Sequence, residues 1–200
     1  MKINKLHLLT IVCSWLLMTG MGMAQTAESA DAIINKATAQ AKKEKKNVIV
    51  MFHASWCGWC KKLDASINDA ACKPLFDKSY VITHLVVQES KGKENLENPG
   101  AAELLTKYYG DKQGIPYFFI FDTKGKLLAD SKMRPDGAEP GTEPGSNLGC
   151  PASDEEVAYF ANLLNKTSSL SDAELQVIKN RFSKNKPAPT TAAPAAVTGR

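Results

Sequence analysis

Residues 54–62 read Ala-Ser-Trp-Cys-Gly-Trp-Cys-Lys-Lys, and this stretch decides the fold. The run before it, Val48 to His53, is apolar, β-branched and too short for a helix, which predicts a buried strand. From Lys61 to about Ala71 we expect a helix, which Pro74 then kinks or restarts. The two cysteines of the stretch therefore lie where a buried strand gives way to a helix.

A Cys-x-x-Cys pair at the start of a helix is suited to redox chemistry. The sulfur of Cys57 would lie near free backbone N–H groups and the positive end of the helix dipole, which stabilise a thiolate. Cys57 would attack a substrate disulfide, and Cys60, turned further inward, would then attack Cys57 and release the product. The same motif occurs in zinc and copper sites. A structural zinc site needs four ligands, however, and with one such pair and His53 as the nearest imidazole we predict neither metal nor cofactor.

The composition suits one domain with a proper core and some additional segments. The chain has 200 residues, of which 44% are hydrophobic, and a formal net charge of +4 from 25 basic and 21 acidic residues. The basic residues are spread along the chain without interleaved aromatic residues, which argues against nucleic acid as a partner.

The first 24 residues resemble a secretory signal peptide. Lys2 and Lys5 give a positive start, Leu8 to Met18 is a short apolar run, and Gly22 and Ala24 are small residues at the two positions that a signal peptidase inspects. The apolar run is shorter than the roughly 20 residues that a membrane span needs. We expect cleavage after Ala24 and export to the periplasm or the exterior.

The remaining sequence alternates helices and strands. The expected elements are helix 29–45, strand Tyr80–Val87, helix Ala101–Tyr109, hairpin strands 116–122 and 126–130, and helices from Ser153 to about Asn165 and from Ser171 to about Ser183. A helix separates the first two strands, which favours a parallel right-handed crossover, and the hairpin adds antiparallel strands at one edge. This predicts an α/β fold, a central mixed sheet flanked by helices.

We expect the exported chain to consist of three segments. We expect one domain over residues 25–170, with residues 131–152 as a long loop, and an additional C-terminal helix over residues 171–185. Residues 186–200 are rich in Pro, Ala and Thr, which predicts a disordered tail.

Two motifs together resemble the thioredoxin superfamily. Residues 54–62 after the strand 48–53 are similar to its active-site stretch, and residues 114–121, Gly-Ile-Pro-Tyr-Phe-Phe-Ile-Phe, are similar to its cis-proline loop leading into an edge-hairpin strand. The resemblance covers about residues 30–166. It implies a thioredoxin fold with Cys57 as attacking thiol, Cys60 as resolving thiol and Pro116 in cis beside them, so that the Ile115 backbone can pair with an extended substrate.

The sequence departs from the family pattern in three ways. The dipeptide between the cysteines is Gly58-Trp59, where cytosolic thioredoxins have Gly-Pro. The buried aspartate that many thioredoxins carry falls at Met51, so another group such as His84, Glu89 or water would have to accept the proton of Cys60. The 131–152 loop is longer than a minimal thioredoxin needs.

Residues around the cysteines are candidates for substrate binding. Trp56 and Trp59 are expected to form a partly exposed platform, because they flank the cysteines of a signature motif. The complete candidate set for substrate binding is Trp56, Gly58, Trp59, Ile115 and Pro116. His53 and His84 are interpreted as structural histidines.

Cys72 and Cys150 are interpreted as a structural disulfide. The chain has five cysteines, and Cys13 would leave with the signal peptide, so an even number remains in an oxidising compartment. A disulfide would tie the long loop to the active-site helix. The alternative is that one of the two is a regulatory thiol that exchanges with the Cys57/Cys60 pair.

These observations predict an exported thiol–disulfide oxidoreductase. The favoured activity is that of a reductase or isomerase. It would act on exported proteins or peptides with disulfides, and a membrane-bound redox partner would keep it reduced. The alternatives are an oxidase that donates disulfides and a thioredoxin-fold module that binds copper or zinc.

Overall fold

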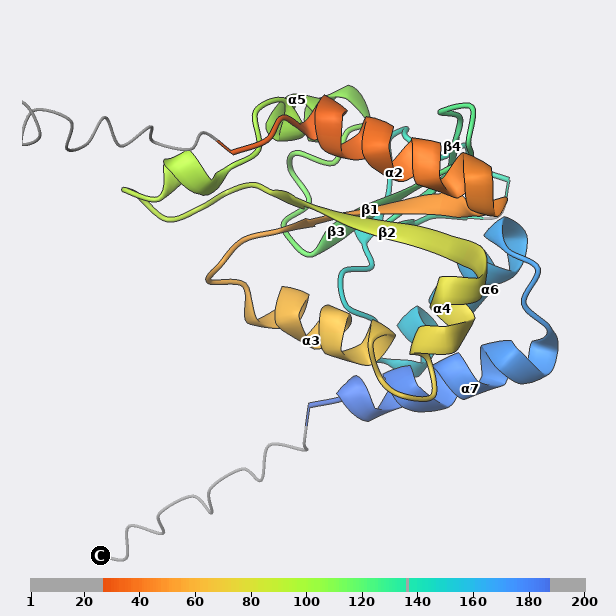
Figure 1. Ribbon diagram of the computed structural model, residues 1–200. Coiled ribbons are helices and arrows are strands. Elements are labelled where there is room, and N and C mark those ends of the chain that lie inside the picture. The colour runs from red at the N-terminus through yellow and green to blue at the C-terminus, as the bar shows by residue number, and fades with distance from the viewer. Residues whose placement is uncertain (1–26, 136, 188–200) are drawn as a thin grey trace, which may run out of the picture.

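The computed structural model describes residues 27–135 and 137–187 (Figure 1). The predicted signal peptide and nearly all of the predicted tail lie outside these residues. The elements are α2 (Ala30–Glu44), β1 (Asn47–His53), α3 (Gly58–Ile67), α4 (Lys73–Ser79), β2 (Tyr80–Val86), η1 (Glu94–Leu96), α5 (Ala101–Lys107), β3 (Tyr117–Phe121), β4 (Leu127–Asp130), β5 (Lys132–Met133), β6 (Ser146–Asn147), α6 (Asp154–Thr167), α7 (Asp172–Phe182) and η2 (Ser183–Asn185).

The central sheet is mixed, as predicted, and has the strand order β2-β1-β3-β4. Strand β1 pairs with β2 in parallel and with β3 antiparallel, and β4 pairs antiparallel with β3. The expectation that the hairpin adds antiparallel strands at one edge is confirmed, because β3 pairs with β1 and β4 forms the edge of the sheet. All five residues of β3, Tyr-Phe-Phe-Ile-Phe, are buried, and a strand without a polar side needs cover on both faces and both edges.

Helices cover both faces of the sheet. Figure 1 shows α2 and α5 on one face, and α3, α4, α6 and α7 on the other. Side chains of β1 alternate between the two cores. Val48 and Val50 pack with Ala37 and Leu105 under α2 and α5, whereas Ile49 and Met51 pack on the side of α3 and α7.

The active-site helix and its successor are two separate helices. Helix α3 ends at Ile67, and α4 begins at Lys73 with Pro74 in its first turn, where a missing N–H costs nothing. The sequence prediction of a restart at Pro74 is therefore confirmed.

The predicted additional C-terminal helix is α7, and it belongs to the main core. Ser171 caps it with the predicted capping box, as Ser153 caps α6. Phe182 is fully buried, with its ring centre 5.0 Å from that of Phe160 and 6.4 Å from that of Phe76. This ring cluster joins α7 to α4 and α6.

The 131–152 segment is more ordered than the sequence indicates. It contains the two-stranded ribbon β5–β6, and the side chains of Lys132 and Arg134 are buried beside the sheet. Arg134 donates two hydrogen bonds to the Asp130 carboxylate, at 2.5 and 2.8 Å. The fully buried Lys132 ammonium lies 3.3 Å from the carbonyl oxygen of Thr142 and 3.2 Å from the Glu143 carboxylate. Paired charges hold this segment together with apolar side chains, since Leu148 and Cys150 belong to the main core.

Candidate active site

Cys57 and Cys60 form a disulfide at the N-terminus of α3, with Cα atoms 5.3 Å apart. Cys57 is the N-cap of the helix, and its sulfur accepts a hydrogen bond from the backbone N–H of Cys60 at 3.1 Å. In the reduced state the same N–H and the helix dipole would stabilise negative charge on the Cys57 sulfur. Strand β1 ends at His53, so the buried strand delivers the chain directly to this position.

Both cysteines of the redox pair are almost fully buried. Cys57 is 2% exposed and Cys60 1%, although Cys57 lies at a helix N-terminus. The reason is that Ala54 and Ile115 pack against the two cysteines. The Cys57 sulfur lies 3.8 Å from the carbonyl oxygen of Ile115, and the Ile115–Pro116 peptide bond is cis. The structure thus brings Ile115 and Pro116 beside Cys57, although they are distant in sequence.

The two tryptophans that flank the cysteines are partly exposed, at 54% for Trp56 and 45% for Trp59. The Trp56 indole donates a hydrogen bond to the carbonyl oxygen of Gln88 at 2.7 Å, which fixes its ring. The Lys62 ammonium lies 4.7 Å from the Trp59 ring centre, within cation–π distance. A Cβ at Gly58 would meet no atom within 4 Å, so the tip of the motif faces open space.

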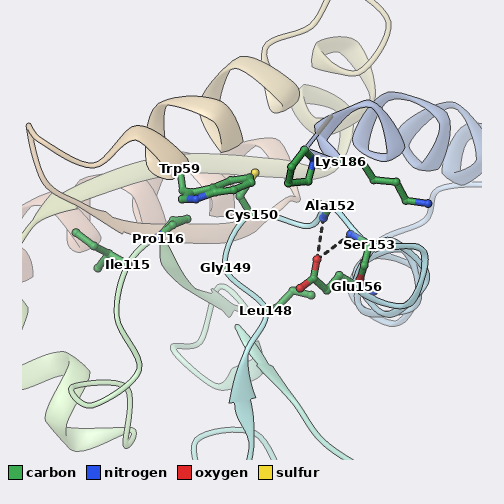
Figure 2. Close-up of a pocket in the computed structure, with 11 residues that line it drawn as sticks. Trp59, Ile115, Pro116, Leu148, Gly149, Cys150, Ala152, Ser153, Glu156 and Lys186 are labelled. Carbon is green, nitrogen blue, oxygen red and sulfur yellow. Dashed lines mark hydrogen bonds between the residues drawn. The ribbon is translucent and has the colours of Figure 1, made fainter. Parts of the chain in front are cut away.

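A groove of about 640 Å³ begins at Trp59 and Pro116 and runs between the N-terminus of α6 and residues 186–187 (Figure 2). Its lining is largely apolar. Its charged members are already paired, since Glu156 accepts hydrogen bonds from the backbone N–H groups of Ala152 and Ser153, and Lys186 pairs with Asp154. The residues that line it are Trp59, Ile115, Pro116, Leu148, Gly149, Cys150, Ala152, Ser153, Glu156, Lys186 and Pro187.

Asn185 fixes the far wall of this groove. Its side-chain amide donates to the carbonyl oxygen of Pro151 at 3.0 Å and to the Cys150 sulfur at 3.5 Å, and its Oδ1 accepts from Ser66 at 3.1 Å. Its backbone carbonyl accepts from Lys62 at 2.9 Å. One buried side chain therefore joins the C-terminal segment, the 131–152 loop and α3.

Sequence reasoning missed the part of the groove that lies outside the motifs. Leu148, Ala152 and residues 186–187 belong to no recognised pattern. The short run Leu148-Gly149-Cys150-Pro151 is apolar within an otherwise polar loop, and that contrast is the signal that could have pointed to it.

The predicted disulfide between Cys72 and Cys150 is absent from the structure, in which both are free and buried. Cys72 is the N-cap of α4 and lies in the main core, and it is not among the residues that line the groove. Each thiol is buried on its own. Burial raises the pKa of both thiols, that of Cys150 to about 11. An even cysteine count therefore does not imply pairing here.

We expect Cys72 and Cys150 to resist modification while the protein is folded. Burial and the raised pKa leave little thiolate at either position. Iodoacetamide at pH 8, added to the oxidised protein, should label neither cysteine in buffer and both in denaturant. Peptide mapping by mass spectrometry reads the result. A Cys72–Cys150 peptide in unreduced protein would restore the disulfide hypothesis.

Two histidines lie beside the active-site helix. His84 on β2 forms a hydrogen bond of 2.8 Å between its Nε2 and Oδ1 of Asp64 on α3, and its ring centre is 5.2 Å from that of His53. Burial, followed by the neighbouring His84, lowers the pKa of His53. Glu89, the other acid considered for this region, accepts hydrogen bonds from the N–H and hydroxyl of Ser55.

The lowered pKa of His53 makes the stability of the protein depend on pH. Between the folded pKa and the ordinary value of about 6.5, the unfolded state binds more protons, so the free energy of unfolding should fall as the pH decreases through this window. Urea denaturation from pH 5 to 7.5 measures this. His53→Gln should flatten the dependence, and an NMR titration of the His53 ring with a pKa above 6.5 would contradict it.

Among residues 27–135 and 137–187, no group of three or more His, Cys, Asp or Glu side chains is arranged to hold a metal ion. In the same part of the chain, no helix is both long and apolar enough to cross a membrane.

Comparison with known proteins agrees with this geometry. A disulfide-forming Cys-x-x-Cys pair at the N-terminus of a helix that packs on an α/β sheet is an arrangement suited to thiol–disulfide redox chemistry. Residues 29–123 match a family model described as thioredoxin-like. The match and the Cys57–Cys60 pair place this segment in the thioredoxin superfamily, as the sequence motifs predicted.

Similar proteins include a protein disulfide-isomerase of Hordeum vulgare, 30% identical over 87 residues, which are 44% of this chain and 14% of that protein. The chain thus matches only a small part of the barley protein. A disulphide isomerase structure from Xylella fastidiosa Temecula1 has 21% identity and a TM-score of 0.44, covering 83% of this chain and 97% of the other. The oxidised C-terminal domain of Neisseria meningitidis DsbD has 18% identity and a TM-score of 0.39, covering 68% and 97%.

Proposed function

We propose that the protein is an exported thiol–disulfide oxidoreductase that reduces or isomerises disulfides in polypeptides. The observation that carries the proposal is the Cys57–Cys60 disulfide at the N-terminus of α3, which packs against Ile115, a residue that also lines the apolar groove. Export rests on the signal peptide predicted for residues 1–24. The electrons would come from a membrane-bound redox partner.

The reaction would proceed in two exchanges. The Cys57 thiolate attacks one sulfur of a substrate disulfide, forming a mixed disulfide and releasing the other sulfur as a thiolate. Cys60 then attacks the Cys57 sulfur, which forms the intramolecular disulfide seen in the structure and releases the second substrate sulfur. Two electrons pass from the protein to the substrate. In isomerisation the released thiolate attacks a different sulfur instead.

The groove favours polypeptides over small charged disulfides such as oxidised glutathione. An extended peptide could lie along Ile115 and Pro116 and place apolar side chains against Leu148 and the Trp59 ring. Glutathione carries carboxylates, and the cation at the groove, Lys186, is already paired with Asp154 at 2.7 Å. Peptides with apolar residues next to the cysteine should therefore react faster.

The test is a comparison of substrates together with a redox titration. The reduced protein should reduce insulin faster than oxidised glutathione at equal disulfide concentration. Equilibration with glutathione buffers should give a potential near that of thioredoxin, about −270 mV, rather than near −120 mV, the value of a strong oxidant. A potential close to −120 mV would favour the oxidase alternative. No exchange with either substrate would refute the proposal.

A further inference from the structure

The resolving thiol needs a proton acceptor inside the protein. Cys60 attacks as a thiolate, yet it is 1% exposed and so has little direct contact with bulk water. Met51, on the strand below α3, is apolar and cannot accept the proton. The acceptor must come from another side chain near α3.

Asp64 and His84 form a hydrogen-bonded pair one helical turn away from Cys60. Asp64 follows Cys60 by one helical turn, and residues four apart on a helix are surface neighbours, with Cβ atoms about 5–6 Å apart. Its Oδ1 lies 2.8 Å from Nε2 of His84. The register between β1 and β2 pairs His84 with Met51, so the imidazole is on the same sheet face as Met51, the face that α3 covers.

We propose that the Asp64–His84 pair accepts the proton of the Cys60 thiol in the resolving step, an inference that rests on the proposed function. The Cys60 proton passes to the Asp64 carboxylate, directly or through one water, while the Nε2–H of His84 donates to Oδ1 of the same carboxyl group and holds it in place. The Cys60 sulfur then bonds to the Cys57 sulfur as the bond from Cys57 to the substrate breaks. The departing substrate thiolate takes a proton from solvent, and the Asp64 carboxyl group loses its own there.

The surroundings allow this proton to leave. The side chains of His84 and Asp64 are 36% and 32% exposed and line a solvent-open hollow of about 480 Å³. The other titratable groups that face it are Glu44 and Lys46 beside α2, Lys73 and Asp77 on α4, Tyr80 on β2 and, behind His84, His53 on β1. The first four form two ion pairs with each other, and the Tyr80 hydroxyl is hydrogen-bonded to Thr167. No unpaired charge competes with the pair among these groups.

A purely electrostatic role for Asp64 would have the opposite effect. A nearby carboxylate disfavours the Cys60 thiolate, so removing its charge would lower the pKa of Cys60 and speed the resolving step. Removing a proton acceptor slows that step. The sign of the effect therefore separates the two roles.

The experiment follows both exchanges in one reaction. Reduced protein is mixed in a stopped-flow instrument with one equivalent of dithiobis(nitrobenzoate), from pH 4.5 to 8. The first nitrothiobenzoate is released when Cys57 attacks, and the second when Cys60 resolves the mixed disulfide. The variants are Asp64→Asn, His84→Gln and the double variant. The matched control is Asp77→Asn, a carboxylate that lines the same hollow and is paired with Lys73 instead of His84.

We expect Asp64→Asn to slow the second release roughly a hundredfold at pH 7, which is the low end for a positioned proton acceptor. The first release should stay within about twofold, and the double variant should be no slower than the slower single one, because the two residues act as one unit. Added imidazole should speed the second release in His84→Gln through the open hollow. Asp77→Asn should match the wild type.

Three outcomes would overturn the inference. They are a second release that is unchanged or faster in Asp64→Asn, equal slowing of both releases, and equal slowing by Asp77→Asn. Each of these leaves the first release in the wild type intact and so leaves the proposed function standing. Failure of the proposed function would appear separately, as a wild-type protein that does not reduce insulin.

Discussion

Cys57→Ser is expected to lower the rate of insulin reduction by roughly a thousandfold or more, because a serine hydroxyl is not ionised at neutral pH and cannot replace the attacking thiolate. Cys60→Ser should retain the first exchange and accumulate mixed disulfides, since the resolving thiol is missing. Insulin turbidity with dithiothreitol measures the first effect. Mass spectrometry of unreduced protein, incubated with a disulfide-bonded client, detects the trapped species in the second.

The matched control is Cys72→Ala, which removes a buried thiol away from the groove and should leave turnover unchanged. Trapped clients on Cys57→Ser, with none on Cys60→Ser, would reverse the roles assigned to the two cysteines. Full turnover in both single variants would exclude the dithiol mechanism altogether.

Phe182→Ala should have the second large effect, a decrease of about 3–5 kcal/mol in the free energy of unfolding. The ring is fully buried between Phe76 and Phe160, and three helices meet there, so the site cannot collapse easily after truncation. Urea denaturation followed by circular dichroism measures the change. The result tests whether α7 belongs to the folding unit of the sheet.

Val177→Ala is the control on the same helix, because Val177 is 38% exposed, and it should change stability by less than about 0.5 kcal/mol. A small effect of Phe182→Ala would mean that α7 docks only weakly on the rest of the protein. A separate, earlier unfolding transition would lead to the same conclusion.

The sequence predicts the part of the fold that depends on local pattern. The apolar run before Cys57, the capping boxes at Ser153 and Ser171, and the turn after Asp122 each carry their own signal, so the order of the elements follows from short stretches. The position of β3 inside the sheet depends instead on how four strands pair across the chain. No single stretch encodes that arrangement.

The site divides in the same way. Cys57, Cys60 and the residues around Pro116 are recognisable from their motifs, whereas the low exposure of the cysteines results from Ala54 and Ile115 packing on them. Part of the order in the 131–152 segment comes from Asp130 and Arg134 pairing in the interior. Charged residues in a Gly/Pro-rich stretch normally indicate solvent exposure, so their burial could not be predicted from composition.

The contacts of Asn185 mean that the redox pair and the groove are completed at different stages of synthesis. The chain leaves the ribosome with its N-terminus first, so Cys57 and Cys60 emerge long before Asn185. Asn185 lies near the C-terminal end of the described residues and fixes the far wall of the groove. A nascent chain therefore carries its reactive dithiol before the groove has its final wall. Under the proposed function, the groove can select among substrates only after residue 185 has been translated and Asn185 has packed against Pro151.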